Sequence, residues 1–248
     1  MSDLIDFELD AMKIGITFVA LILLSLLFWQ KPELDQIVAA SFYSVKNRHF
    51  WLAEHHYLEL WRHVVVALLF LMSMGLAITL ILKIIKPSLV KKIKAKTALY
   101  VLLCFLVGPG LIVNLILKDH WGRPRPSQVE IYGGMAIFQP VWKVSQQCNR
   151  NCSFVCGDCA MVFTLFAWVP LVRRQKLALV LVSLAGLTIS ALRVSAGGHF
   201  LSDALIAGLI SYLVVNLIYN LMYSSQKFSE ERTEHFFTLL HAKFMRLL

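Results

Sequence analysis

The sequence predicts an all-α integral membrane protein that folds as one domain, residues 1–248, built as a bundle of six helices. Two observations carry this prediction. The chain of 248 residues is 58% hydrophobic and only 16% charged, whereas soluble domains contain about 25% charged residues. Six apolar runs approach the roughly 20 residues that a helix needs to cross the hydrocarbon core, and helices pair their backbone groups without water. These runs lie near residues 14–29, 64–85, 97–117, 159–172, 177–192 and 201–223.

The basic residues predict how the bundle is oriented in the membrane. They gather in the second connection (83–96), in the fourth (173–176) and in the C-terminal segment (227–246). Six spans place these three segments on one side, together with the N-terminus. Positive residues favour the cytoplasmic side, so we expect both termini in the cytoplasm. Because this distribution accounts for the net charge of +9, the charge does not indicate nucleic-acid binding.

Two segments outside the spans are predicted to lie along the membrane surface. The first, Gln36–Arg62, mixes aromatic with basic residues, which is typical of a helical segment against lipid head groups. Its histidines and glutamates lack the spacing of metal ligands, so we interpret them as surface residues. The second, residues 225–248, has phenylalanines and leucines at near-helical spacing, which predicts an amphipathic cytoplasmic helix.

A cluster of three cations follows the third predicted span. Lys118, Arg123 and Arg125 occur in a segment that two prolines stiffen. Counting spans places this segment on the outer face, where orientation in the membrane does not require positive charge. The guanidinium group forms paired hydrogen bonds with phosphate, and lysine adds a point charge. We therefore predict an anion clamp here rather than a head-group anchor.

The connection between the last two spans, Arg193–Asp203, carries a second group of polar residues. His199 and Asp203 are four residues apart, so they share one face of a helix. A carboxylate that accepts one imidazole N–H leaves the other ring nitrogen free as a base or nucleophile. The glycine pair before His199 allows a tight turn and the close approach of an anion to the backbone.

A third segment, Cys148–Cys159, opens the fourth span. Gly157 and the amides that follow it at the helix start offer N–H groups to an anion. Span counting places all three segments at the same membrane face. Cations, helix-terminal amides and a carboxylate-oriented imidazole together suit a phosphate dianion, so we predict a phosphate-binding site.

The spacing of these residues resembles that of the type 2 phosphatidic acid phosphatase superfamily, whose lipid phosphatases have six membrane helices. Two of its three motifs, K-x6-RP and R-x5-H-x3-D, are intact. The residues that match them are Lys118, Arg125, Pro126, Arg193, His199 and Asp203. The third motif, PSGH, is replaced by the sequence VCGD at residues 155–158. The resemblance covers nearly the whole chain, from the helix layout to the order of the motifs.

This resemblance implies a two-step phosphoryl transfer that needs no metal or other cofactor. His199 would attack phosphorus and form a phosphohistidine, while Asp203 holds its tautomer, and water would then hydrolyse the intermediate. Cations and a backbone amide would bind the phosphate oxygens and stabilise the charge of the transition state. The implied phosphate-binding residues are Lys118, Arg125, Cys156, Gly157 and Arg193, with Arg123 as an auxiliary.

The altered central motif differs from the family pattern at two positions. Asp158 stands where the family has the histidine that protonates the leaving oxygen. A carboxyl group can act as this general acid only when it is protonated, which burial and an adjacent phosphate favour and nearby cations oppose. We predict that Asp158 is this general acid. The alternative is that Asp158 caps the fourth helix. Cys156 replaces a serine, and its thiol is a weaker hydrogen-bond donor to phosphate.

The cysteines of this segment allow two further interpretations. The spacing Cys152-x3-Cys156-x2-Cys159 matches that of an iron–sulfur cluster in radical S-adenosylmethionine enzymes. Those enzymes resemble soluble barrels, so we expect no cluster here. A disulfide between Cys148 and Cys152 is expected if that side is periplasmic. Cys104 is predicted to lie in the core.

Within the superfamily the chain resembles bacterial lipid A 1- and 4′-phosphatases in size and layout. That likeness implies a phosphorylated lipid as substrate and membrane lipids as surroundings. It also implies a bacterial inner membrane, with the active site facing the periplasm. Undecaprenyl pyrophosphate and glycerophospholipids stay open as substrates, as does phosphoryl transfer to a lipid acceptor. The altered motif also leaves open a relative that binds lipid phosphate without catalysis. No feature of the sequence predicts an oligomeric state.

Overall fold

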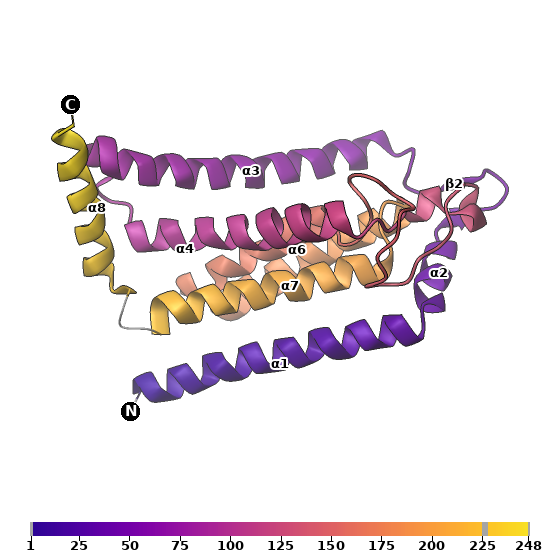
Figure 1. The fold of residues 1–248 in the computed structure, drawn as a ribbon, viewed down its shortest axis with the longest axis horizontal. Helices are drawn as coiled ribbons and strands as arrows, with labels where there is room; N and C mark the ends of the chain where they lie inside the picture. The colour runs from indigo at the N-terminus through magenta and orange to yellow at the C-terminus, as the bar shows by residue number, and fades with distance from the viewer. Residues whose placement is uncertain (1, 225–227, 248) are drawn as a thin grey trace.

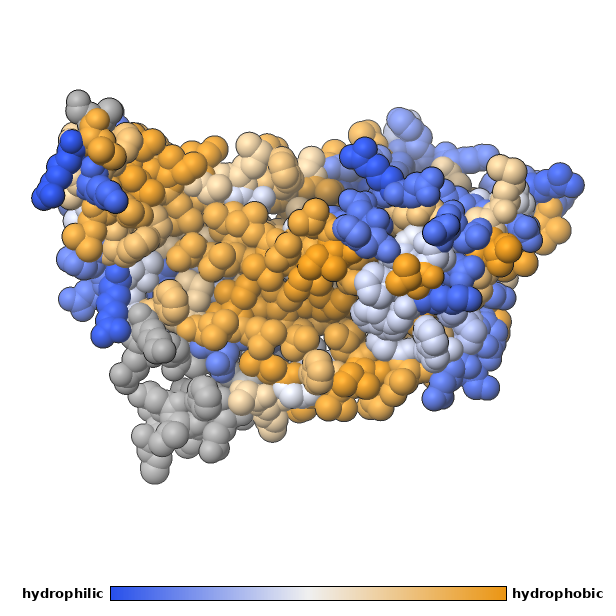
Figure 2. Space-filling model, in the orientation of Figure 1, coloured by the Kyte–Doolittle hydropathy of each residue, from blue (hydrophilic) through white to orange (hydrophobic). Residues whose placement is uncertain are grey.

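Long helices lie side by side along most of the length of the molecule (Figure 1). The structure, a computed structural model, describes residues 2–224 and 228–247. Within these residues, five helices are long and apolar enough to cross a membrane, and a shorter apolar helix accompanies them. Figure 2 shows apolar residues over the middle of the molecule and hydrophilic residues gathered at its two ends. The predicted all-α membrane fold is confirmed.

Successive apolar helices alternate in direction along the chain when the shorter one is included with the five long ones, so that each connection lies at one end of the bundle or the other (Figure 1). Two of them continue as π-helices, η2 and η6. Their bounds are α1 (Ser2–Gln30), α3 (His56–Ile85), α4 (Ala95–Phe105) with η2 (Leu106–Lys118), α6 (Gln175–Ser195) and α7 (Leu201–Tyr219) with η6 (Asn220–Ser224). Short 3-10 helices in the connections are η1 (Pro87–Val90), η3 (Pro126–Gln128) and η4 (Glu130–Tyr132).

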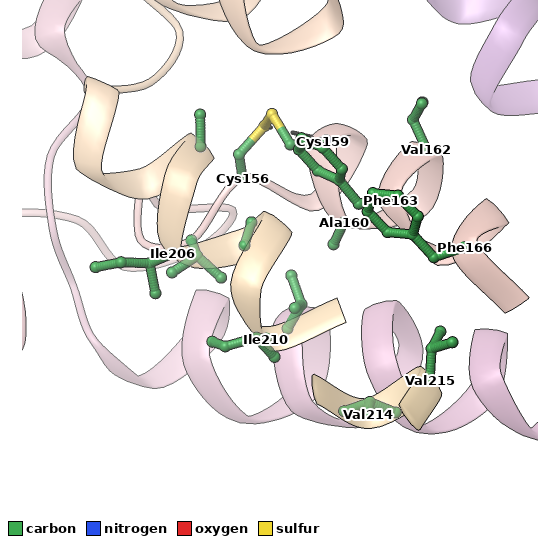
Figure 3. Packing of buried hydrophobic residues seen from close by; sticks show 14 of the residues in the cluster. Cys156, Cys159, Ala160, Val162, Phe163, Phe166, Ile206, Ile210, Val214 and Val215 are labelled. Atoms are coloured by element: carbon green, nitrogen blue, oxygen red, sulfur yellow. Dashed lines mark hydrogen bonds between the residues drawn. A yellow bond between two sulfur atoms is a disulfide. The ribbon is translucent and has the colours of Figure 1, made fainter. Parts of the chain in front are cut away.

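The shorter apolar helix corresponds to the fourth predicted span. It comprises α5 (Gly157–Phe163) and the 3-10 helix η5 (Thr164–Leu171). Helix α5 packs against η2, α6 and α7. Its buried residues join those of α7 in the main hydrophobic core, part of which appears in Figure 3. A helix enclosed by others in this way does not need the length that a lipid-exposed span requires.

Two glycines allow α6 and α7 to approach α5 closely. A Cβ atom at Gly186 would lie 2.2 Å from the ring of Phe163, and one at Gly208 would lie 2.9 Å from the same ring. Small residues of this kind permit close packing between membrane helices. Phe163 therefore fills the space that the missing side chains leave.

The substitution Gly186→Ala is expected to destabilise the protein by about 1–3 kcal/mol, because the new methyl group overpacks the contact with Phe163. Thermal or chemical unfolding of the purified protein in detergent measures the effect. Gly75→Ala on α3 is the matched control, since no atom lies within 4 Å of a Cβ built there. Alanine has the higher helix propensity, so this control is expected to be neutral or stabilising. Equal losses in the two variants would contradict the packing argument.

The helix that ends at Lys118 changes its winding at a proline. Pro109 lies inside it, and the chain continues beyond Phe105 as the π-helix η2. The side-chain amide of Asn114 donates a hydrogen bond of 2.7 Å to the carbonyl of Pro109. Proline disturbs the regular backbone hydrogen bonds of a helix, and short π-helical stretches often occur at functional sites. In this chain the π-helix carries Lys118 at its last position.

The connection between α1 and α3 is only partly helical, which corrects the prediction for Gln36–Arg62. It contains α2 (Glu33–Ala40) and an antiparallel hairpin of β1 (Tyr43–Ser44) and β2 (His49–Phe50). Aromatic residues favour strands, and here they pack on one another: the rings of Tyr43 and Phe50 lie 5.2 Å apart. Helix α3 begins at His56, earlier than predicted, so Arg62 belongs to it.

The predicted C-terminal helix is present as α8 (Glu230–Met245) and packs across the ends of α3 and α4. Glu234 accepts hydrogen bonds from Lys83 Nζ, at 2.6 and 2.8 Å from its two oxygens, and from the amide of Ala95 at 2.9 Å. Burial opposes ionisation of this carboxyl, but these donors lower the pKa of Glu234. Phe237 is buried beside Leu80. Residues 225–227 and 248 of the predicted segment lie outside the described residues.

Candidate active site

The three polar segments found in the sequence meet at one end of the bundle. A Cβ atom at Gly157 would lie 3.3 Å from Lys118 Nζ. The amide of Cys156 donates to the carbonyl of Asp203 at 3.2 Å. Arg193 Nε lies 3.3 Å from a carboxylate oxygen of Asp158. These contacts join η2, α5, α6 and α7, as span counting predicted.

His199 lies in the loop between α6 and α7 and is almost fully buried. Its Nδ1 lies 2.7 Å from the carbonyl oxygen of Ser153. Since a carbonyl only accepts, Nδ1 carries the proton and Nε2 keeps its lone pair. Burial, together with the charges of Arg193 and Lys118, lowers the pKa of His199 to about 4, against the opposing effect of Asp203. The imidazole is therefore neutral near pH 7, as a nucleophile requires.

Asp203 acts on His199 through an intermediate residue, which differs from the predicted direct contact. Its carboxylate lies 3.9 Å from His199 Nδ1, too far for a hydrogen bond. It accepts instead from Ser153 Oγ at 2.5 Å and from the amide of Phe200 at 2.9 Å. Ser153 thus links the two residues, because its hydroxyl bonds Asp203 and its carbonyl bonds His199. The acceptor is a backbone atom, for which the sequence has no signature.

Arg123 is buried and hydrogen-bonded to Asp203, Asp35 and Ser202, which corrects its prediction as an auxiliary phosphate ligand. Its side chain is fully buried. The guanidinium group donates to Asp203 at 2.5 Å, to Asp35 at 2.8 Å and to Ser202 Oγ at 2.9 Å. It also stacks on the ring of Phe200, 4.5 Å from the centroid. All of these partners satisfy its donors inside the protein.

Asp35, on α2, is a buried member of this network that the sequence analysis missed. It accepts a hydrogen bond of 2.9 Å from the amide of Ser202 in addition to the bond from Arg123. Burial raises the pKa of Asp35, and Arg123 partly offsets that effect. Burial disfavours charged Arg123 as well, but Asp203 and Asp35 raise the pKa of its guanidinium. The charged forms of Asp35, Asp203 and Arg123 therefore stabilise one another in the buried network.

The remaining predicted cations surround Gly157 and Asp158. Arg193 lies against Gly198, where a Cβ atom would be 2.6 Å from its Nη2. Arg125 donates to the carbonyl of Asn151 at 2.9 Å, and burial lowers the pKa of its guanidinium. Gly157 leaves open the space beside Lys118, since a Cβ atom there would also lie 2.8 Å from Asn114 Oδ1.

Asp158 is paired with two arginines, and one of them was missed by the sequence analysis. Arg62 Nη1 lies 2.7 Å and Arg193 Nε 3.3 Å from the same oxygen, Oδ2. The alternative that Asp158 caps the helix does not hold, because the N-cap of α5 is Cys156, whose sulfur accepts from the amide of Cys159. Arg62 is the last residue of the segment that we interpreted as a head-group contact, so no local signal marked it.

All four cysteines of the Cys148–Cys159 segment form disulfides. Cys148 pairs with Cys152, as expected for an oxidising compartment, and Cys156 pairs with Cys159 (Figure 3). The predicted thiol of Cys156 is therefore not available as a donor to phosphate, and these sulfurs are not free to ligate an iron–sulfur cluster. The second disulfide encloses Gly157 and Asp158. Cys104 is buried and unpaired.

At one end of the bundle of apolar helices, the structure thus brings a neutral imidazole held in one tautomer together with several cations. The model of the PAP2 superfamily matches residues 97–227, more than half of the chain. The chain belongs to the PAP2 superfamily.

Curated relatives are similar to this chain over about half of its length. The chain is 49% identical over 125 residues to a lipid A 4′-phosphatase of Francisella tularensis subsp. novicida (strain U112); the match covers 49% of this chain and 56% of that protein. It is 43% identical over 121 residues to a lipid A 4′-phosphatase of Rhizobium leguminosarum, covering 48% of this chain and 50% of the relative. The match thus spans about half the length of these relatives. No solved structure matches the chain.

Proposed function

We propose that the protein is a membrane lipid phosphatase that hydrolyses the 4′-phosphate monoester of lipid A through a phosphohistidine at His199. The observation that carries this proposal is the state of His199: its Nδ1–H is bonded to Ser153, so the lone pair of Nε2 is free. The names of the relatives supply the substrate. A buried neutral imidazole beside cations suits attack on a phosphate ester.

The proposed reaction has two displacements at phosphorus. Nε2 of His199 attacks phosphorus, a P–N bond forms, and the bond from phosphorus to the sugar oxygen breaks; that oxygen takes a proton from Asp158 or from water and leaves as the 4′-hydroxyl. Water then attacks the phosphohistidine and gives up a proton to the solvent, the P–N bond breaks, and inorganic phosphate leaves with His199 neutral again. Lys118, Arg125 and Arg193 stabilise the negative charge that both transition states carry on the phosphate oxygens. These cations supply the electrostatic stabilisation, so we propose that the reaction needs no metal, and full activity after treatment with EDTA is the expected result.

Asp158, the predicted general acid, lies between two arginines. Two guanidinium groups contact its carboxylate, and opposite charges favour the ionised form, which has no proton to donate. Comparing hydrolysis by wild type, Asp158→Asn and Asp158→His across pH decides the role. If the asparagine variant is as active as wild type, Asp158 is not the acid.

The substrate is tested by phosphate release from a panel of pure lipids in detergent. The panel contains lipid A phosphorylated at the 1- or the 4′-position, phosphatidate, phosphatidylglycerophosphate and undecaprenyl pyrophosphate. The expected result is release from the 4′-phosphate of lipid A by wild type and none by His199→Ala. Release from another lipid alone would reject the substrate, and no release from any lipid would reject the enzyme.

We propose further that the site faces the periplasm and that both termini lie in the cytoplasm. The two disulfides at the site end suit an oxidising compartment, and the basic connections at the other end suit the cytoplasm. A cysteine introduced at Met135, which is 93% exposed, tests this topology. In spheroplasts, a thiol reagent that does not cross membranes is expected to label it, and protection there would reject the orientation.

The pKa of His199 predicts how the free protein responds to acid. Because this pKa is lowered to about 4 from an ordinary value of about 6.5, the imidazole is expected to stay neutral down to pH 5. The unfolded chain binds a proton between these two values, so stability is expected to fall as the pH drops from about 6.5 toward 4. NMR titration of ¹⁵N-histidine, with the resonance assigned by His199→Gln, measures the pKa directly. A midpoint near 6.5 would contradict the buried, desolvated site.

A further inference from the structure

Two guanidinium groups from distant parts of the chain converge on one oxygen atom. Arg62 comes from α3 and Arg193 from α6, and both lie close to Oδ2 of Asp158, at 2.7 and 3.3 Å. The arginine side chains are 12% and 9% exposed, whereas that of Asp158 is 19% exposed. The point of convergence is therefore largely buried, and Asp158 is the most exposed of the three side chains.

The position of Arg62 is set by its own helix before any ligand arrives. Its Nε donates to Glu59 Oε2 at 3.0 Å, and its Nη2 donates to Glu59 Oε1 at 2.5 Å. Residues three apart on a helix are neighbours, so this pair needs no tertiary contact to form. The paired bonds direct the remaining nitrogen, Nη1, toward Asp158. An arginine fixed in this way loses little freedom when it binds an anion.

A point within reach of two guanidinium groups, one of which already donates a hydrogen bond there, is suited to an oxygen of a phosphate dianion. Arg193 belongs to the motif that the proposed function assigns to phosphate, and Asp158 now occupies the anion position beside it. A phosphate group bound to Arg193 would lie beside the negative charge of Asp158 unless the carboxylate moved aside. Like charges in contact repel each other strongly in a partly buried site.

We propose that Oδ2 of Asp158 marks the position of a substrate phosphate oxygen, and that Arg62 is a phosphate-binding residue outside the three motifs. Asp158 is then a resident anion: it holds the two arginines together in the empty site, and the phosphate ester displaces it. This inference rests on the proposed function. It also gives ionised Asp158 a function, whereas a general acid has to be protonated. Because the carboxylate competes with phosphate, it also favours release of the product.

Affinity for inorganic phosphate tests the inference without any need for turnover. Isothermal titration of the purified full-length protein in detergent gives Kd for wild type, Arg62→Ala, Asp158→Asn and the double variant. Arg62→Ala removes a charge-assisted hydrogen bond, so it is expected to weaken binding by about 10- to 100-fold. Asp158→Asn is expected to strengthen it by about tenfold, since it removes the competing charge. Arg150→Ala is the matched control, because Arg150 is an exposed arginine on the loop of the same end.

The double variant separates the two possible roles of Arg62. If Arg62 binds phosphate, Arg62→Ala still weakens binding by about tenfold or more in the Asp158→Asn protein. If it serves only to neutralise Asp158, the loss disappears there, and the inference is overturned. Unchanged or weaker binding in Asp158→Asn alone would overturn the resident anion.

Two further measurements keep these outcomes distinct from misfolding and from failure of the proposed function. Thermal unfolding identifies a variant that does not fold, and Arg62→Lys, which keeps the charge but not the fork, is expected to bind phosphate with intermediate affinity. If folded Arg62→Lys binds phosphate no more tightly than Arg62→Ala does, that result counts against direct binding of phosphate by Arg62. Hydrolysis of the lipid panel by wild type tests the enzyme separately: phosphate binding through Arg62 without any hydrolysis would reject the function and retain the site.

Discussion

Replacing His199 with alanine is expected to lower kcat for phosphate release by about 10⁴-fold or more, the loss typical of removing a nucleophile. The variant is also expected to lose all base-stable, acid-labile phosphate on the protein after rapid quenching with ³²P-labelled lipid. Wild type should carry that label as phosphohistidine, because the P–N bond forms before water attacks. Affinity for inorganic phosphate should change far less than kcat, since Lys118, Arg125 and Arg193 are still present.

The His199 experiment needs a control for structure, because the alanine leaves the carbonyl of Ser153 without its hydrogen-bond partner. His199→Gln offers an amide donor of similar length, so it is expected to unfold closer to wild type than His199→Ala while remaining just as inactive. Label that persists on His199→Gln would mean that another residue is the nucleophile. An active His199→Gln would remove the imidazole from the mechanism altogether.

The helices, and the end of the bundle at which the polar segments meet, followed from local signals in the sequence. Apolar runs of about the right length predict spans, and alternation of spans then places Lys118, Gly157 and Arg193 at one end without any knowledge of their contacts. The fourth span departs from the rule of length because α5 and η5 are enclosed by protein. Local composition does not report which helix will be enclosed.

The partners of the site residues could not be predicted, because they come from distant elements and have no local pattern. Arg62 meets Asp158 across 96 residues of sequence, and Asp35 meets Ser202 across 167. Judged only by their neighbours in sequence, Arg62 and Asp35 resemble ordinary surface residues at a membrane interface. The Cys156–Cys159 disulfide was missed for a different reason: comparison with a serine in the family motif drew attention to the thiol as a donor rather than as a pairing partner.

The second large effect is expected for Arg123, whose removal leaves two buried carboxylates without their shared cation. Arg123→Ala is expected to destabilise the protein by about 3–5 kcal/mol, the usual effect of breaking a buried ion pair by removing one partner. Thermal unfolding in detergent measures this loss. Arg174→Ala, an exposed arginine at the opposite end, is expected to change stability by less than about 0.5 kcal/mol.

The dependence of that loss on pH distinguishes charge from packing. Burial already raises the pKa of Asp35 in the intact protein, and without Arg123 it is expected to rise further. The folded variant then takes up a proton that the unfolded chain, with an ordinary aspartate pKa of about 3.9, does not bind near neutral pH. By the linkage relation, stability of the variant falls as pH rises through this interval. Arg123→Ala should therefore be closer to wild type at pH 5 than at pH 8, whereas a loss of packing alone would be the same at both. Because the network holds Ser153 through Asp203, the folded fraction at pH 5 should also show a lower kcat with little change in KM, as expected for a residue that positions His199 and does not touch the substrate.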